Sequence, residues 1–432
     1  MIVFYRIIFP FIAVLVAPYY LLRMLRRGGY GSKLHYRLGL FPSLPPKKKE
    51  CKRIWIQAVS VGELSSLAKI LTKLKEDQRI EIVLTGTTST GLRMAAEKFS
   101  DHLLAQGPFP LDWWLFSGMA WSRINPDLII TVDSELWPEH FHQAANRGIP
   151  ALVINARLSD RTYRRLNHSS LARIFLLPPG LEVLTTSERQ RSRWSNLGVP
   201  ESSVFVVGNL KVDAVSSPDS RTRSVEELKA EFGFSAGCFV LVGLSTWPGE
   251  EELLVETLRE IRKLGNDVRL LLIPRHAERG NKLCNWLEKE GFPYHARSRS
   301  PQAPQGTLIY LADTTGELPQ LICVADLAFG GKTLPPNQGG QNPIEPIAQG
   351  IPLVLGPNYQ NFRETCSDML VHDAIRAEKS QSEVKNLLLS LIQDQKALEQ
   401  LSESAIQWMK SQSSPSDRTL EKIYQLLQIQ RI

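Results

Sequence analysis

Apolar strand-like runs that alternate with helical stretches in both halves of the chain predict an α/β protein of two Rossmann-like domains. The runs Ile54–Val59 and Leu128–Val132 show little polar alternation, as expected for parallel strands covered on both faces. The same rhythm starts again at Phe239–Gly243, which predicts a second doubly wound sheet. The length of 432 residues agrees, because it exceeds what one ordinary core accommodates.

The predicted strands are short and bounded by turn residues. They cover residues 54–59, 81–85, 128–132, 151–155, 183–185 and 204–207, then 239–243, 269–274, 307–311, 327–329 and 352–355. The rhythm pauses at Asp213–Arg223, where Ser, Pro, Asp and Thr dominate, as in a linker. We therefore predict a first domain over residues 28–212, a linker over 213–223 and a second domain over 224–432.

The first 27 residues predict a membrane anchor with a basic flank. Residues 1–22 carry one charge, Arg6, and three arginines follow within residues 23–27. A bilayer span needs about 20 apolar residues, and Pro10 and Pro18 weaken a straight helix. The charge bias places the chain after residue 22 in the cytoplasm. An uncleaved single-pass anchor in the inner membrane is the favoured interpretation, and a helix lying in the membrane plane is the alternative.

The net charge of +7 indicates an anionic membrane surface rather than nucleic acid. Residues 1–49 hold nine of the 51 basic residues and no acidic residue, which leaves 42 basic against 44 acidic residues elsewhere. The basic excess is therefore local and lies beside the apolar segment. Five cysteines without a close pair predict neither a disulfide framework nor a zinc site.

Glu63 is the first candidate functional residue. It follows the predicted strand Ile54–Val59, after Ser60–Gly62 breaks the apolar run, and Leu64 and Leu67 then begin a helical pattern. Open α/β sheets bind ligands at the edge where strands end, so a carboxylate there can serve catalysis. An acidic residue in a first turn also stabilises the helix dipole, and position alone leaves both roles open.

Other polar groups also follow predicted strands. Asp133 and Glu135 come after one strand of the first half and Lys211 after another. In the second half Arg275 follows a strand, and Gly339–Pro346 forms a glycine turn before a helix. Free N–H groups at a helix start bind phosphate. Their shared position predicts ligand sites at the strand ends of both halves.

These residues resemble the Kdo transferases, glycosyltransferase family 30, which move 3-deoxy-D-manno-octulosonic acid (Kdo) from its cytidine monophosphate (CMP) carrier to the lipid A precursor. The resemblance extends from about Gly28 to Glu364. It rests on motifs at residues 59–63, 85–91, 134–138, 155–159, 208–211, 274–276, 316–318, 325–329 and 339–346.

The resemblance implies a glycosyltransferase-B fold of two facing Rossmann-like domains, the first for the acceptor and the second for the CMP-sugar, behind a membrane-anchor helix. It implies inverting transfer of Kdo from CMP-Kdo to lipid IVA in lipopolysaccharide biosynthesis, with no cofactor and no essential metal. It assigns Glu63 as proton acceptor and Asp133 and Lys211 as transition-state stabilisers. It places the CMP contacts on Pro274, Arg275, Thr315, Gly316, Glu317, Asn342, Pro343, Ile344 and Glu345.

Three residues depart from the family pattern. Asp133 stands where glutamate is usual, which shortens its reach by one methylene, and Glu135 can compensate. Gln341 stands where histidine is common, so an imidazole role is lost. Thr315 replaces a usual methionine, a mild change if the contact is made by the backbone.

Two other functions remain open from the sequence. One is a transferase or epimerase that uses a UDP-sugar on the same fold. The other is a catalytically inactive, membrane-tethered binding protein, against which the retained Glu63, Lys211 and Arg275 argue. Protection by UDP or CMP, and transfer assayed with EDTA present, distinguish the three.

Overall fold

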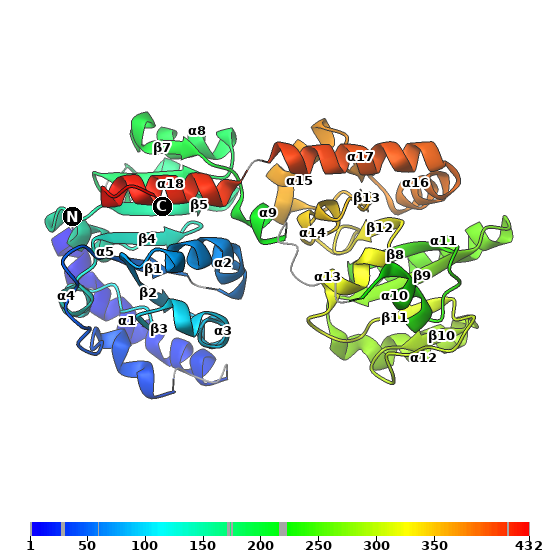
Figure 1. Ribbon diagram of the computed structural model, residues 1–432, viewed down its shortest axis with the longest axis horizontal. Coiled ribbons are helices and arrows are strands. Elements are labelled where there is room, and N and C mark those ends of the chain that lie inside the picture. Colours follow the sequence, from blue (N-terminus) through cyan, green and yellow to red (C-terminus); the bar gives the residue numbers. More distant parts are fainter. Residues whose placement is uncertain are drawn as a thin grey trace. The chain divides into compact units, whose positions relative to one another are not determined.

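The computed structural model describes residues 2–26, 31–58, 60–170, 173, 176–215, 223–412 and 414–431. The chain forms two compact units (Figure 1). Unit 1 comprises Met1–Ala214 with Ser414–Ile432, and unit 2 comprises Val215–Ser413. Within the described residues each unit contains one seven-stranded sheet, and all strand pairs are parallel. The predicted class, two Rossmann-like α/β domains, is confirmed.

The sheet of unit 1 has the strand order β3-β2-β1-β4-β5-β6-β7. Its strands are β1 (Lys52–Gln57), β2 (Ile80–Gly86), β3 (Ala105–Pro108), β4 (Leu128–Val132), β5 (Ala151–Ala156), β6 (Leu181–Thr185) and β7 (Val204–Val206). The order reverses between β1 and β4, where Ile56 pairs with Ile130. This reversal is the switch point at which doubly wound sheets bind ligands.

Helices cover both faces of this sheet, because successive strand residues point to opposite faces and both sets are apolar. Ile54 and Ile56 pack in one cluster with α2 and α3, whereas Trp55 packs in another with α4 and α5. The helices of unit 1 are α1 (Ile2–Arg26), α2 (Val61–Glu76), α3 (Ser89–Phe99), α4 (Trp114–Ile124), α5 (Pro138–Asn146), α6 (Asp160–His168), α8 (Glu188–Asn196), α9 (Leu210–Val215) and α18 (Pro415–Leu427). Short 3-10 turns cover Gly31–Leu38 (η1), Ser100–His102 and Glu201–Ser203.

Helix α1 is long and apolar enough to cross a membrane. Its segment Ile2–Tyr19 has a mean hydropathy of 2.0, and none of that segment is buried inside the protein. Pro10 and Pro18 lie inside the helix.

The sheet of unit 2 repeats the doubly wound order, as β10-β11-β9-β8-β12-β13-β14. Its strands are β8 (Phe239–Thr246), β9 (Val268–Pro274), β10 (Tyr294–Ala296), β11 (Ile309–Leu311), β12 (Leu327–Gly330), β13 (Leu353–Leu355) and β14 (Arg376–Ala377). Its helices are α10 (Val225–Glu231), α11 (Glu250–Lys263), α12 (Gly280–Glu290), α13 (Leu318–Leu321), α14 (Ile344–Ala348), α15 (Arg363–Val371), α16 (Gln381–Gln393) and α17 (Gln395–Ser411). The 3-10 turns cover Ala277–Arg279, Ile322–Val324 and Gln360–Phe362.

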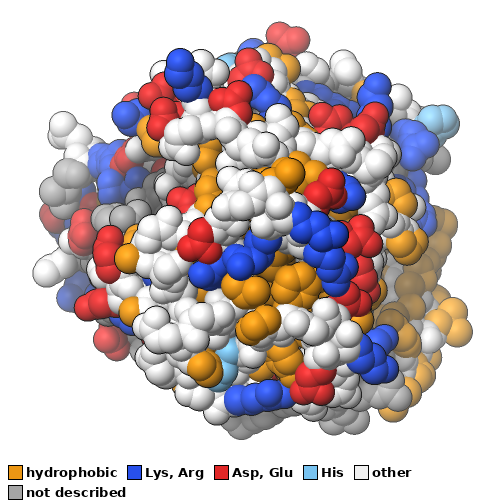
Figure 2. Space-filling view, turned by 90° about the vertical axis from the view of Figure 1, so that its right-hand side faces the viewer, with side chains coloured by type: hydrophobic (Ala, Val, Ile, Leu, Met, Phe, Trp, Pro, Cys, Tyr) orange, Lys and Arg blue, Asp and Glu red, His pale blue; other side chains and the backbone are white. Residues whose placement is uncertain are grey.

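Basic and acidic side chains lie side by side on the face of the molecule shown in Figure 2. This mixture agrees with the nearly balanced charge of the chain outside residues 1–49. The basic excess that sets the net charge is therefore not spread over that face.

The domain boundary predicted for the C-terminus needs correction. The sequence assigned all of residues 224–432 to the second domain, whereas α18 belongs to unit 1. Leu420, Ile423 and Tyr424 of α18 are buried in the same cluster as Ile54 of β1. The apolar face of α18 thus completes the core of the first sheet.

Several short elements escaped prediction, and two predictions lie outside the described residues. The strands β3, β10 and β14 and the helices α6, α9, α10 and α15 were not anticipated. Val59, the predicted end of the first strand, is not described, and β1 ends at Gln57. Of the predicted linker, residues 216–222 lie outside the described residues, and 213–215 continue α9.

Candidate active site

Two carboxylates stand at the topological switch point of unit 1. Glu63 follows β1 and Asp133 follows β4, and these two strands pair in parallel. Parallel strands end at the same edge of a sheet, so both residues belong to the edge outside which α/β sheets bind ligands. The predicted location of Glu63, between a strand end and a helix start, is confirmed.

The Glu63 side chain is fixed by the start of α2. Its backbone N–H donates to the Ser60 hydroxyl over 3.4 Å, and that hydroxyl donates to Glu63 Oε1 over 2.9 Å. Ser60 is therefore the N-cap of α2, and the half-buried Glu63 carboxylate is held above the first turn. A carboxylate has about four lone-pair sites, so the cap and a reacting hydroxyl can share it.

Asp133 is held by an unusual backbone and two partners. Its φ of 60° lies in the left-handed region, which aspartate and asparagine adopt more readily than most residues. Asn155 Nδ2 donates to Asp133 Oδ1 over 2.6 Å, and Arg157 Nη2 donates to Asp133 Oδ2 over 2.8 Å. Both partners stand at the end of β5, so the carboxylate is oriented by the neighbouring strand.

Asn155 also connects Asp133 to the segment that carries Lys211. The backbone N–H of Leu210 donates to Asn155 Oδ1 over 3.1 Å, and the Lys211 N–H donates to Asn209 Oδ1 over 3.0 Å. One buried amide therefore bridges the switch point and the start of α9. Through Asn155, the structure connects Asp133 to the backbone of Leu210, the residue before Lys211.

Glu135 has the most perturbed pKa of this edge. Burial first, and then the negative charges of Glu63 and Asp133, raise the pKa of its carboxyl to about 7. Three carboxylates thus share one electrostatic environment. A carboxyl group that titrates near neutral pH can gain or lose a proton under working conditions, as general acids and bases must.

Unit 2 contains a cavity of about 240 Å³ at the corresponding edge of its own sheet. It is lined by Leu244, Ser245, Arg275, Leu318, Gly330, Gln341, Asn342, Pro343, Glu345, Pro346, Leu353 and Leu355. Four predicted contacts, Arg275, Asn342, Pro343 and Glu345, therefore meet in one place. Among the described residues no carboxylate pairs with the exposed Arg275 side chain, so its charge faces solvent.

Asn342 organises the polar wall of this cavity. Its Nδ2 donates to Glu345 Oε1 over 3.0 Å, and its Oδ1 accepts the Ile344 N–H over 3.2 Å. One N–H at the start of α14 is thus already bonded within the protein. Fewer backbone N–H donors are therefore free to bind an anion at this helix start than the sequence predicted.

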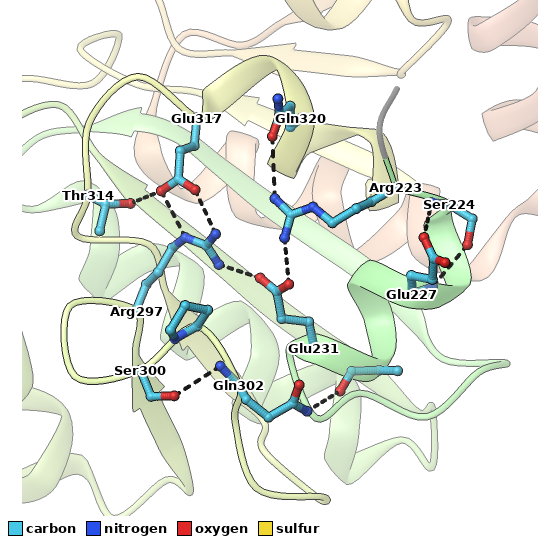
Figure 3. A network of polar contacts seen from close by, with 12 residues as sticks. Arg223, Ser224, Glu227, Glu231, Arg297, Ser300, Gln302, Thr314, Glu317 and Gln320 are labelled. Carbon is cyan, nitrogen blue, oxygen red and sulfur yellow. Dashed lines mark hydrogen bonds and ion pairs between the residues drawn. The ribbon is translucent and has the colours of Figure 1, made fainter. Parts of the chain in front are cut away.

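The other predicted contacts do not line the cavity. Pro274 and Ile344 are buried. Thr315 and Gly316 are exposed, in the loop just before Leu318. The Glu317 carboxylate accepts from Arg297 Nε over 2.9 Å and Arg297 Nη2 over 2.6 Å (Figure 3).

Comparison with known proteins identifies the family. The sequence profile described as 3-Deoxy-D-manno-octulosonic-acid transferase (kdotransferase) matches residues 32–214. A 3-deoxy-D-manno-octulosonic acid transferase of Haemophilus influenzae is 30% identical over 339 residues, which cover 78% of this chain and 77% of that protein. The chain belongs to this family. It is therefore a Kdo transferase, an enzyme.

Further similarities agree with the Kdo transferase family and its fold. A 3-deoxy-D-manno-octulosonic acid transferase of Chlamydophila psittaci is 28% identical over 366 residues, covering 84% of this chain and 82% of that protein. UDP-GlcNAc 2-epimerase from Neisseria meningitidis has a TM-score of 0.60 at 12% identity, covering 86% of this chain and 100% of that structure. At that identity the similarity shows the shared two-domain glycosyltransferase-B-like fold alone.

The structure of this Kdo transferase adds two residues that sequence reasoning left without a role. Asn155 and Arg157 hold the Asp133 carboxylate, although only their motif had been noted. Their place at the end of a predicted strand, beside the one that precedes Asp133, was the signal that could have identified them. Across the described ranges no group of three or more His, Cys, Asp or Glu side chains is arranged to hold a metal ion.

Proposed function

We propose that this Kdo transferase moves Kdo from CMP-Kdo to a hydroxyl group of lipid IVA, with inversion at the anomeric carbon, in lipopolysaccharide biosynthesis. Family membership supports the transferred sugar. The observation that carries the mechanism is the carboxylate group of Glu63, Asp133 and Glu135 at the switch point of unit 1. An inverting transfer needs a base at the acceptor hydroxyl, and this edge offers one in a fixed position.

Glu63 is the proposed base. The acceptor oxygen forms a bond to the anomeric carbon, its proton passes to Glu63, and the bond from that carbon to the CMP phosphate oxygen breaks. The electron pair of the broken bond leaves with CMP. A general base contributes about 10²–10⁴-fold to such a step. The Ser60 hydrogen bond keeps the carboxylate in one orientation, which suits proton transfer to a positioned group.

Asp133 and Lys211 are the proposed stabilisers of the transition state. Positive charge grows on the sugar ring as the leaving bond breaks, and negative charge grows on the phosphate. Asp133 offsets the first and Lys211 the second. Asn155 supports both roles, because it binds Asp133 and the backbone beside Lys211.

The proposed CMP site is the cavity of unit 2. Arg275 supplies a cation for the phosphate, and Asn342 and Glu345 supply polar groups for the nucleoside. Pro343 adds an apolar wall, and the buried Pro274 and Ile344 are proposed to fix the positions of their chain neighbours Arg275 and Glu345. Thr315, Gly316 and Glu317 are proposed to contribute backbone groups, since the Glu317 carboxylate is bonded to Arg297.

The domain roles and the location are part of the same proposal. Unit 1 takes the lipid acceptor and unit 2 the CMP-sugar, and the reaction requires that the donor's anomeric carbon reach Glu63. The enzyme acts at the cytoplasmic face of an inner membrane, anchored by α1. Either form of anchor, single-pass or in-plane, retains the basic residues after Leu22 on that side.

The test is transfer to lipid IVA by purified Glu63→Gln, compared with Glu76→Gln at the exposed end of the same helix. We expect Glu63→Gln to lose about 10²–10⁴-fold in kcat. CMP-Kdo binding should persist in both variants, and Glu76→Gln should keep wild-type turnover. Substantial turnover by Glu63→Gln would remove Glu63 from the base role. EDTA should leave the wild-type rate unchanged, and protection by UDP instead of CMP would point to a UDP-sugar enzyme.

A further inference from the structure

The first two turns of α1 are bonded to unit 1. Tyr5 donates its hydroxyl hydrogen to Asp112 Oδ2 over 2.8 Å. Arg6 donates from Nε and Nη2 to the two carboxylate oxygens of Glu139 over 2.8 and 2.9 Å. Trp113 donates its indole N–H to the Arg6 carbonyl over 2.8 Å. The apolar segment is therefore attached near its beginning to the folded unit.

The acceptors of these bonds are built into the core of unit 1. Asp112 and Glu139 are buried, and the backbone N–H groups of Glu139 and His140 both donate to the Asp112 carboxylate. The Glu139 carboxylate also accepts from Gln143. Arg6 thus supplies positive charge to a carboxylate that the fold holds away from water.

The face of α1 that points away from unit 1 is apolar. Side chains that recur at helical spacing on this outer face are between 58% and 80% exposed: Val3, Phe4, Ile7, Phe11, Val14, Leu15 and Leu22. The opposite face, with Tyr5, Arg6, Phe9, Ala13 and Ala17, is partly buried. A helix on the surface of a soluble domain has the reverse arrangement, with its polar side toward solvent.

Both ends of α1 belong to the same unit. Beyond the helix, η1 is bonded to unit 1 by Lys33 Nζ, which donates to the Gln106 carbonyl over 3.2 Å, and by Arg37, which donates to the Phe109 carbonyl. A helix of 25 residues is about 37 Å long, enough to cross a hydrocarbon core of about 30 Å. A crossing helix would hold its beginning and the segment after it on opposite sides of that core, and here the beginning of α1 and η1 both contact one folded unit.

We propose that α1 lies in the plane of an anionic bilayer, with its outer face in the boundary between headgroups and acyl chains, and does not cross it. The proposal rests on the membrane location proposed above and specifies its form, replacing the single-pass anchor that the sequence favoured. A bilayer is the favoured occupant because residues 1–49 hold nine basic residues and no acidic one. Trp114 and Leu115, next to Trp113, are also exposed and suit a membrane interface.

The test measures the depth of single spin labels along α1 in vesicles of phosphatidylethanolamine and phosphatidylglycerol. Cysteines replace Phe4, Phe11 or Leu15 in a full-length chain whose five native cysteines are serine, and retained Kdo transfer in detergent shows that it folds. A label at Val371, an exposed apolar residue of unit 2, is the control and should stay in water. We expect the three α1 labels to lie about 5–10 Å below the headgroups, at similar depths.

Two results would overturn the proposal. In a crossing helix the depths at Phe4 and Leu15 would differ by about 16 Å, because the rise is about 1.5 Å per residue. Spin–spin coupling between chains in the absence of vesicles would instead assign the outer face to a second copy. An N-terminal tag on the unmodified chain gives a second measurement: it should resist external labelling in intact spheroplasts, and labelling would indicate a span. Substantial transfer by Glu63→Gln together with similar depths at all three sites would contradict the proposed enzyme mechanism and leave the in-plane helix standing.

Discussion

Replacing Arg297 by methionine should destabilise unit 2, because this cation joins two carboxylates that come from different elements. Arg297 follows β10, and its side chain is 5% exposed. It binds Glu317 through Nε and Nη2, and its Nη1 donates to Glu231 over 2.5 Å and to the Tyr310 hydroxyl over 2.9 Å (Figure 3). Methionine keeps much of the side-chain length and removes every one of these bonds.

The expected loss can be worked out from the partners left behind. Removing one member of a buried ion pair costs about 3–5 kcal/mol. Glu231 keeps a second partner, Arg223, and the Glu317 side chain is 32% exposed, so both carboxylates retain some solvation. We therefore expect the low end, about 3 kcal/mol. For a unit of this size about 1 kcal/mol shifts Tm by about 2–4 °C, which gives a decrease of about 6–12 °C.

The pH dependence of the stability difference between wild type and Arg297→Met gives a second, independent test. Hydrogen bonds from Arg297 are the main cause that lowers the pKa of the Glu317 carboxyl to about 2. A depressed carboxyl pKa stabilises the fold above the unfolded value of about 4.3, and the stabilisation is lost as pH falls toward 2. The stability difference between wild type and Arg297→Met should therefore be full at pH 6 and shrink between about pH 4 and pH 2.

The assay is calorimetric unfolding of the full chain, with the transition of unit 2 identified by its shift when CMP is added. Arg376→Met is the matched control, because its partner Asp373 is largely exposed and three residues away. An exposed pair contributes about 0–1 kcal/mol, so the control should change Tm by about 4 °C or less. A shift of that small size for Arg297→Met would refute the reasoning, as would a larger difference at pH 3 than at pH 6.

Three further predictions concern the candidate site. Arg275→Ala should weaken CMP binding by about tenfold or more in calorimetric titration, because it removes a charge-assisted bond to phosphate, whereas Arg376→Ala should leave binding unchanged. The Glu135 carboxyl, whose pKa is raised to about 7, makes the free energy of unfolding of wild type fall as pH rises from about 4 to 7. Glu135→Gln lacks this fall. Its free energy of unfolding in urea at pH 8, relative to that at pH 5, should therefore exceed the wild-type difference by about 2 kcal/mol. Asn155→Asp should lower kcat at least about tenfold with little change in KM, because it sets a second negative charge against Asp133. A higher KM with unchanged kcat would instead assign Asn155 to substrate binding.

The strands that position the site were predictable because both of their faces are buried. Ile54, Trp55 and Ile56 face clusters on the two sides of the sheet, and this demands an apolar run that is visible in the sequence. Glu63 followed from that run, since a parallel strand and the next helix define the edge between them. The strand β3 shows the limit. Its sequence Ala-Gln-Gly-Pro has no strand pattern, and it forms because β2 offers a parallel partner, with Val83 opposite Ala105.

Partners across the fold could not be predicted in the same way. The periodic apolar residues of α18 indicate a buried face and do not say which sheet it covers, so its place in unit 1 needed the structure. The same limit applies to the side chain of Glu317. The family resemblance implied a CMP contact at Glu317, and the structure bonds its carboxylate to Arg297 from a loop 20 residues earlier.

The departure at position 133 shows how such partners change the chemistry of a site. Aspartate is one methylene shorter than the usual glutamate, and here its carboxylate is drawn toward Asn155 and Arg157 at the end of β5. Arg157 neutralises one of the three negative charges that Glu63, Asp133 and Glu135 would bring together. Because the pKa of Glu135 is raised to about 7, a second charge is lost over part of the neutral range. The proposed base Glu63 therefore shares this edge with fewer than two unbalanced negative charges at neutral pH, which favours its proposed role as proton acceptor.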